Sequence, residues 1–436
     1  MEYPYPDLPD VPRISLLDPD SDHGMGPGSP PESQWHKSAH DALIHGLQVL
    51  RQDHKSGAKE LATRALGVLL DVAKIVGSSS STMEDMNERE MYTFMEYWSY
   101  AVRKSGWVIS RYGRPSMGAA ISSAIVKTLR RVADVVVVEG GREQHNTRSS
   151  KTDILPTPVR EGIMALQGQL QSREDNSGSE VGAQLRKFMR DRFVKETSDG
   201  SGDLEIKVLT LSSSSTIRAA LGTVLKLELE AARARQTQKP LRIDLRIMES
   251  RPLCEGVSMA QALVNAAEEF GYVHMLRIQI ASDASVAMLA RDVDIVLLGA
   301  DRISGSGDVS NKIGSFPAVL CAKAMSEHAL VVTVSEFEKV AKPGKTADHG
   351  EEDNDVAELT AAWESSKGIT EARPGLWEEI VRVRNVYFEW VPAQYIHCYV
   401  CEDGSLTVED VRKRSKLALE EENDIFSEFD SGILQH

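Results

Sequence analysis

Apolar residues recur at helical spacing through the first part of the chain. In HDALIHGLQVLRQD, Leu43, Leu47 and Leu50 fall on one helical face. KELATRALGVLLDVAKIVG repeats the pattern until Gly77, which is typical of a helix end. MNEREMYTFMEYWSYAVRKSG and MGAAISSAIVKTLRRVADVVVV have the same character. Residues 36–138 are therefore predicted to form an all-helical domain.

A polar loop and more helical sequence follow this domain. Residues 139–156 are polar, and a helical pattern then runs from Pro158 to about Thr197, interrupted by the polar stretch Ser172–Ser179. The turn-rich TSDGSGD ends this part of the chain. We predict a loop and a connecting helical segment over 139–203.

The hydrophobic period changes after Asp203. EIKVLTL, LRIDLRIME, HMLRIQIAS, DIVLLGAD and HALVVTVSE are short apolar runs, each followed by a turn or a helical segment. Strands that alternate with helices predict a parallel sheet covered on both faces. The predicted fold class is α/β, with an N-terminal all-helical domain followed by a Rossmann-like parallel-sheet domain at 204–412.

Polar side chains stand where each predicted strand ends. In open parallel sheets, ligands bind beyond the carboxyl ends of the strands. The polar clusters at these ends cover residues 210–216, 249–256, 282–285, 301–312 and 335–338. Topology alone therefore predicts that they converge at one edge of the sheet.

Three segments are predicted to lie outside the two domains. Residues 1–35 are rich in Pro, Asp, Ser and Gly and are predicted to be disordered, because they bury too little apolar surface to offset ordering entropy. An acidic surface insertion is predicted near 341–371. Residues 413–436 are interpreted as an acidic tail.

Charge and cysteine content exclude several classes of protein. A formal net charge of −15 argues against a general nucleic-acid-binding surface, which needs a basic stripe. Four cysteines are too few for a disulfide scaffold, and Cys398-x-x-Cys401 has no second pair, so we expect no metal and no cofactor. The start lacks a signal peptide pattern and no apolar run reaches membrane-spanning length. We therefore expect a cytoplasmic protein without membrane contact, although cytosol and nucleus are not distinguished.

The stretch GADRISGSGDVSNKIG, Gly299–Gly314, combines a strand end, a Gly-rich turn and the polar trio Asp301, Asn311 and Lys312. It resembles the signature of methylthioribose-1-phosphate isomerases, where Gly-Ala-Asp-Arg-Ile is followed by Asn-Gly-Asp-Val-Ala-Asn-Lys-Ile-Gly. Ser306 stands where that family usually has Asn. Ribose-1,5-bisphosphate isomerases and the α, β and δ regulatory subunits of translation initiation factor 2B carry looser versions.

Other segments support the same resemblance. MESRPLCEG is similar to the family's Glu-Thr-Arg-Pro-x-x-Gln-Gly, with Glu255 in place of Gln, and FEWVPAQYI is similar to its closing Phe-Asp-x-x-Pro. GRPSMGAAISSAI resembles the helical-domain segment in which an Arg-Pro pair opens a helix. KSGAKELATRAL has Lys55 and Ser56 where the isomerases keep Arg. The resemblance covers roughly residues 36–412 and is strongest at 207–340.

Moving a sugar carbonyl between two carbons needs two acid–base groups on opposite sides of the sugar. The resemblance implies Asp301 as one catalytic group and a Cys on the first strand as the other. Ser212 stands at the Cys position here, and a serine hydroxyl is a far weaker acid than a thiol, whose ordinary pKa is about 8.5. Its sequence neighbours Leu211, Ser213 and Ser214 supply no base.

A phosphate group needs Arg or Lys side chains, or backbone N–H groups at a helix N-terminus. The candidate ligand-binding residues are Arg114, Ser213, Arg251, Asn311 and Lys312. Each has a structural alternative as a helix start, a cap, a local ion-pair partner or a loop brace. The Ser212–Ser215 run is equally consistent with a phosphate-binding turn and with a helix N-cap.

Two functions remain open at this point. The missing Cys and the acidic segments favour a regulatory-subunit-like member of the initiation factor 2B family that binds a sugar phosphate or nucleotide. Asp301 and the nearly complete motif favour an aldose–ketose isomerase acting on methylthioribose 1-phosphate or ribose 1,5-bisphosphate. The resemblance further implies a homodimer or hetero-oligomer formed through the α/β domain.

Overall fold

The computed structural model describes residues 8, 11, 16, 34–54, 56–78, 87–143, 155–175, 178–194, 204–234, 240–344, 353–366 and 379–430. Most of the predicted disordered segment 1–35, and residues 345–352 and 367–371 of the predicted insertion, lie outside these. The chain divides into two compact units. The helical unit comprises Met1–Asn176 and Leu417–His436, and the sheet unit comprises Ser177–Lys416.

The helical unit confirms the helices expected from the 3.6-residue period. They are α1 (Gln34–Gln52), α2 (Ala58–Gly77), α3 (Glu88–Tyr112), α4 (Gly118–Glu143) and α5 (Thr157–Asp175). Helix α3 begins with a capping box, in which Asn87 and Glu90 exchange side-chain-to-backbone hydrogen bonds. The buried indole of Trp98 donates to the carbonyl of Ala73 at 2.9 Å and so joins α3 to α2.

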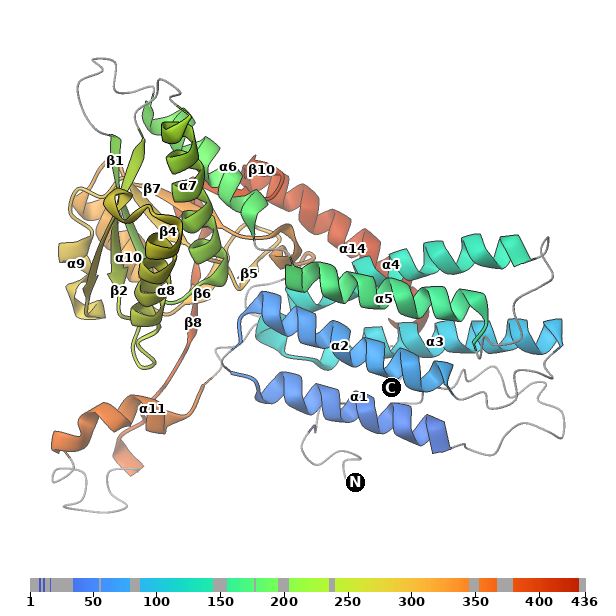
Figure 1. Ribbon diagram of the computed structural model, residues 1–436. Coiled ribbons are helices and arrows are strands. Elements are labelled where there is room, and N and C mark those ends of the chain that lie inside the picture. The colour runs from blue at the N-terminus through green and yellow to red at the C-terminus, as the bar shows by residue number, and fades with distance from the viewer. Residues whose placement is uncertain are drawn as a thin grey trace. The chain divides into compact units, whose positions relative to one another are not determined.

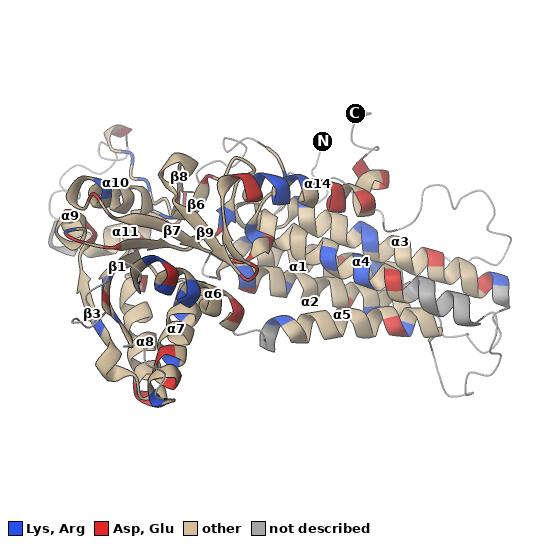
Figure 2. Ribbon diagram, turned by 90° about the horizontal axis from the view of Figure 1, so that it is seen from above, with Lys and Arg blue, Asp and Glu red and all other residues tan. Residues whose placement is uncertain are grey.

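The segment interpreted as an acidic tail is helical up to Asp430. It forms the later part of α14 (Val408–Asp430), and from Leu417 onward it belongs to the helical unit. Its acidic residues lie among arginines of α3 and α4 (Figure 2). Arg111, for example, is 2.8 Å from Glu422 and 2.9 Å from Asp430. The segment also buries Phe426. Its apolar face therefore packs inside the protein, which explains the amphipathic pattern.

The sheet unit contains the predicted parallel sheet (Figure 1), with strand order β10-β9-β7-β4-β1-β2-β3. Only β10 runs antiparallel to its neighbour. The central strand β1 pairs with β2 from Leu204↔Leu241 to Leu211↔Met248 and with β4 at Val208↔Ile295. The strands are β1 (Leu204–Leu211), β2 (Leu241–Met248), β3 (Leu276–Ala281), β4 (Ile295–Leu298), β7 (Leu330–Val334), β9 (Cys398–Cys401) and β10 (Gly404–Leu406).

Helices cover both faces of this sheet, as the alternation of strands and helices predicts. One core packs α6, α7 and α8 against one face, and a second core packs α9 and α10 against the other. The helices are α6 (Ser179–Met189), α7 (Ser215–Arg233), α8 (Glu255–Phe270), α9 (Val286–Leu289) and α10 (Ser315–Met325).

A buried carboxylate fixes α7 to its neighbours. Glu228 accepts hydrogen bonds from Arg186 at 2.7 Å, from Arg190, and from the Leu241 amide at 2.9 Å. Burial by itself raises the pKa of Glu228, but these donors lower it below the ordinary value. The carboxylate is therefore ionised and fully paired inside the unit.

A second, three-stranded antiparallel sheet was not predicted. It consists of β5 (Arg302–Ile303), β6 (Val309–Lys312) and β8 (Phe388–Val391), in the order β5-β6-β8. The sequence predicts a Gly-rich turn after Asp301, and the structure has the β5–β6 hairpin there. Asp308 braces the hairpin turn by accepting from the hydroxyls of Ser304 and Ser306 at 3.1 and 2.7 Å.

Candidate ligand site at the strand ends

Ser212 follows the last residue of β1 and has a positive φ of 60°, which is uncommon for a non-glycine residue. Its amide N–H donates to the Ser250 hydroxyl at 2.7 Å, and its own hydroxyl donates to Glu255 Oε2 at 2.9 Å. Sequence neighbours offered no base for Ser212. The first residue of α8 supplies a carboxylate from another part of the chain, and this corrects that expectation.

Glu255 also pairs with a cation from the second sheet. Its Oε1 lies 3.3 Å from Nζ of Lys312, the last residue of β6. The same ammonium lies 4.7 Å from the ring centroid of Tyr387 and 5.0 Å from that of Phe388, within cation–π range. Glu255 therefore lies between a hydroxyl and an ammonium group.

A small pocket opens beside this pair. It is lined by Ser250, Arg251, Pro252, Glu255, Lys312 and Tyr387. The Arg251 side chain is exposed, and its backbone N–H donates to Asp283 at 2.7 Å. The Ser250 N–H donates to the other oxygen of Asp283 at 2.9 Å. These bonds fix the backbone of the turn after β2, and Arg251 is one of the residues that line the pocket.

Asp301 and Asn311 have defined structural contacts. The Asp301 backbone N–H donates to the Ser310 carbonyl at 2.9 Å, and its carboxylate is half-buried. The buried Asn311 donates to the Ser315 hydroxyl at 3.0 Å and so braces the start of α10. A Cβ at Gly299 would lie 3.0 Å from the Ser214 hydroxyl, so this position at the end of β4 accepts no larger residue without a shift.

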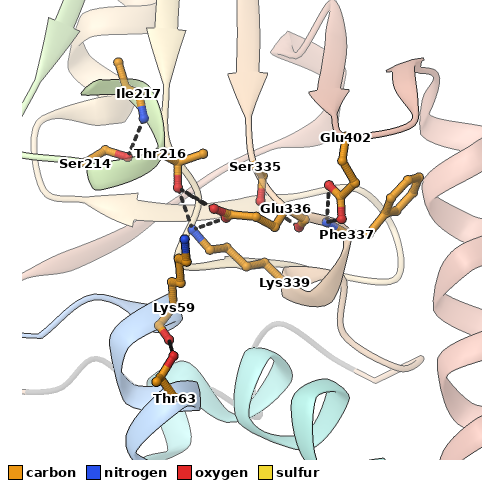
Figure 3. A network of polar contacts seen from close by, with 10 residues as sticks. All are labelled: Lys59, Thr63, Ser214, Thr216, Ile217, Ser335, Glu336, Phe337, Lys339 and Glu402. Atoms are coloured by element: carbon orange, nitrogen blue, oxygen red, sulfur yellow. Dashed lines mark hydrogen bonds and ion pairs between the residues drawn. The ribbon is translucent and has the colours of Figure 1, made fainter. Parts of the chain in front are cut away.

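Shortly after β7 lies a buried ion pair that the sequence analysis does not predict (Figure 3). Lys339 Nζ is 3.0 Å from Glu336, and the Thr216 hydroxyl donates to the same carboxylate at 3.0 Å. Although burial alone raises the pKa of Glu336, Lys339 lowers it to about 2. Burial lowers the pKa of Lys339, but the carboxylates of Glu336 and Asp301 together raise it above the ordinary value.

The sequence contains a partial signal for this cluster. The polar group 335–338 at the end of β7 was identified as part of the converging edge, but Lys339 was not included. A lysine is almost never fully buried unless it is paired. Its sequence position after a short turn gives no indication of burial, so only the folded contacts identify it.

The Ser-rich turn acts as a helix cap. Ser214 accepts the Ile217 N–H at 3.3 Å and is the N-cap of α7, whereas Ser213 is half-buried. Arg114 belongs to the helical unit, where it precedes a short 3-10 helix, is buried, and donates to the Asp53 carbonyl. Its phosphate-binding role stays a prediction.

The structure thus brings some of the candidates together. Ser212 and Lys312 contact Glu255, and Arg251 lines the same pocket. The charge of Asp301 acts on Lys339 and raises its pKa.

The cysteines of the CxxC sequence are poor nucleophiles. Burial raises the pKa of the Cys398 thiol to about 12 and raises that of Cys401 as well.

Fold and site together define an α/β protein with a helical N-terminal unit and a polar pocket at the carboxyl edge of a parallel sheet. The sequence profile of the Initiation factor 2 subunit family matches residues 120–408. The chain therefore belongs to the Initiation factor 2 subunit family.

Similar proteins include enzymes and translation factors. The chain is 31% identical over 176 residues to the methylthioribose-1-phosphate isomerase of Rhodopirellula baltica. The aligned residues cover 39% of this chain and 45% of that protein. It is 31% identical over 194 residues to that of Cronobacter sakazakii, covering 44% and 52%. The chain thus spans about half the length of these curated relatives. The crystal structure of eIF2B beta from Chaetomium thermophilum has a similar fold, with a TM-score of 0.52, 14% identity, and coverage of 90% of this chain and 98% of that one.

The described part of the chain offers neither a membrane-spanning helix nor a cluster of metal ligands. No helix there is long and apolar enough to cross a membrane. The same residues contain no group of three or more His, Cys, Asp or Glu side chains placed to hold a metal ion.

Proposed function

We propose that this chain is a regulatory-subunit-like member of its family that binds a phosphorylated sugar in the strand-end pocket and does not isomerise it at an enzymatic rate. The observation that carries the proposal is the group at Ser212. A hydroxyl held by Glu255 at 2.9 Å replaces the thiol that the isomerase resemblance implies. Arg251 and Lys312 supply positive charge at the same pocket.

An aldose–ketose isomerase acting on a phosphorylated sugar is the second candidate. The local similarity to methylthioribose-1-phosphate isomerases favours it, as does the presence of Asp301 in a nearly complete motif. Glu255 also favours it, because a carboxylate next to Ser212 offers a second acid–base group where the thiol is missing.

Assembly through the α/β domain is part of the proposal. Helix α8 exposes Val257 and Val264, and α10 exposes Leu320 and Met325. Exposed apolar side chains on the same unit support an interaction surface between chains. Light scattering at micromolar concentration tests this, and a purely monomeric protein would contradict it.

Thermal unfolding in the presence of sugar monophosphates, sugar bisphosphates and nucleotides tests the binding function. A ligand at 100 times its Kd stabilises the fold by about 2.7 kcal/mol. The resemblance implies that Asp301 contacts the ligand, so we expect Asp301→Asn to weaken sugar-phosphate binding roughly ten- to hundredfold. Asp403→Asn, at an exposed position, is the matched control and should leave binding unchanged.

Turnover separates the two candidates. We expect wild-type protein and Ser212→Cys to leave methylthioribose 1-phosphate and ribose 1,5-bisphosphate unchanged while a sugar phosphate still binds. Wild-type turnover of about 1 s⁻¹ or faster, which is ordinary for enzymes, would establish the isomerase and refute our proposal. Activity that appears only in Ser212→Cys would identify a chain that has lost the isomerase pair.

A further inference from the structure

We infer that Glu255 acts as an internal anion at Lys312, so that the pocket takes an uncharged, hydroxyl-bearing part of its ligand at this position and no phosphate. This inference rests on the proposed function and narrows the ligand to a sugar with a single phosphate.

The first step is the charge balance at Lys312. Its ammonium is 3.3 Å from one oxygen of Glu255, and the other oxygen accepts from the Ser212 hydroxyl at 2.9 Å. The side chains of Lys312 and Glu255 are 18% and 24% exposed, so the pair is only partly screened by water. A phosphate reaching Lys312 or Ser212 would lie beside a carboxylate, and two like charges a few ångströms apart repel strongly.

A second position that could bind an anion, the N-terminus of α10, is also occupied by a carboxylate of the chain. The N-terminus of α10 follows Lys312 closely in sequence, and helix N-termini favour anions. Here Glu389 of β8 accepts from the backbone N–H groups of Gly314 at 2.6 Å and Phe316 at 3.0 Å. Carboxylates of the chain itself therefore occupy both positions.

The remaining groups suit a ligand that has an uncharged, hydroxylated part and one phosphate. Carboxylate oxygens accept from hydroxyl groups, and the ammonium of Lys312 donates to hydroxyl oxygens. The exposed Arg251 lines the same pocket and offers a bidentate partner for one phosphate. A sugar with a phosphate at one end fits these charges, whereas a second phosphate would meet Glu255.

Inorganic phosphate tests this directly, independently of any sugar. Its Kd is measured by calorimetry at low ionic strength for wild type, Glu255→Gln, and the double variant Glu255→Gln/Lys312→Met. We expect Glu255→Gln to bind phosphate at least tenfold more tightly than wild type, and the added Lys312→Met to abolish this gain. Glu268→Gln removes the same charge from an exposed site on α8 and should leave the affinity unchanged.

Two outcomes would overturn the inference. One is a Glu255→Gln affinity for phosphate no higher than that of Glu268→Gln. The other is a gain that persists without Lys312. If Glu255 were only a partner for the α8 N-terminus, Glu255→Gln would lower the melting temperature and leave phosphate affinity unchanged.

A second binding experiment uses sugar phosphates. We expect the ratio of affinities for ribose 1,5-bisphosphate and ribose 5-phosphate to shift at least tenfold toward the bisphosphate in Glu255→Gln. If wild type binds neither sugar, the proposed function fails, and the inorganic phosphate measurement still decides the role of Glu255. A wild-type preference for the bisphosphate would refute the restriction to one phosphate.

Discussion

Lys339 places an ammonium group inside the sheet unit, and Lys339→Met would remove it without changing the length of the side chain greatly. The Glu336 and Lys339 side chains are only 16% and 6% exposed, with 3.0 Å between their charged atoms. Removing one partner of such a buried pair costs roughly 3–5 kcal/mol, because the other charge is left uncompensated. Lys339 lowers the pKa of Glu336 to about 2 although burial raises it, which has the sign that this reasoning requires.

The sign of the pH dependence follows from the same pKa. A carboxyl group whose pKa is lower in the folded state contributes stability above its unfolded pKa. In wild type this contribution is complete above pH 4.5 and is lost as the pH falls toward about 2. In Lys339→Met, burial dominates and raises the pKa of Glu336. The variant should therefore show its largest deficit near neutral pH and a smaller one in acid, where Glu336 takes up a proton.

Urea unfolding at several pH values between about 4 and 7 measures this deficit. The double variant Glu336→Gln/Lys339→Met should recover most of the lost stability, because no buried charge remains. Lys413→Met breaks an exposed pair with Asp410 at 3.6 Å and should cost less than about 1 kcal/mol. A deficit in Lys339→Met below about 1 kcal/mol, or one that does not change with pH, would refute this reasoning.

Two further predictions concern stability. Glu228→Gln should lower the free energy of unfolding by roughly 3–5 kcal/mol, because it leaves the Arg190 guanidinium without its buried counter-charge. Calorimetry or urea unfolding measures this loss, and a loss below about 1 kcal/mol would contradict the prediction. Phe429→Ala should cost roughly 3–5 kcal/mol, since the ring is buried and lies 5.4 Å from that of Tyr100. Leu417→Ala, at an exposed site on the same helix, should change stability by less than about 0.5 kcal/mol, and equal losses in the two variants would refute the packing argument.

The strands and their convergence were predictable because they depend on regular periods and on topology. The run IVLL of β4 is apolar throughout, as a strand buried on both faces requires, and β1 and β2 pair in parallel. That adjacency brings Ser212 and Arg251 to one edge. The helical period likewise identified the helices of the N-terminal unit.

The contacts of Glu255 and Lys339 could not be predicted from the sequence. Each depends on the path of a turn after a strand, and charged residues in turns are usually exposed. The β5-β6-β8 sheet escaped prediction for a different reason. Its strands have two to four residues, too few to show a period, and β8 lies beyond the acidic insertion. The sequence therefore predicts a loop at Lys312, which lies on β6.

Helix α14 has a consequence for biosynthesis. Ribosomes make a chain from its N-terminus, and N-terminal units usually fold first. Here residues from Leu417 onward complete the helical unit, so Phe426 and the acidic partners of Arg111 are synthesised after the whole sheet unit. The helices α1 to α5 are therefore synthesised before the helix that completes their unit. During this interval their unburied apolar surface is a natural target for chaperones on the nascent chain.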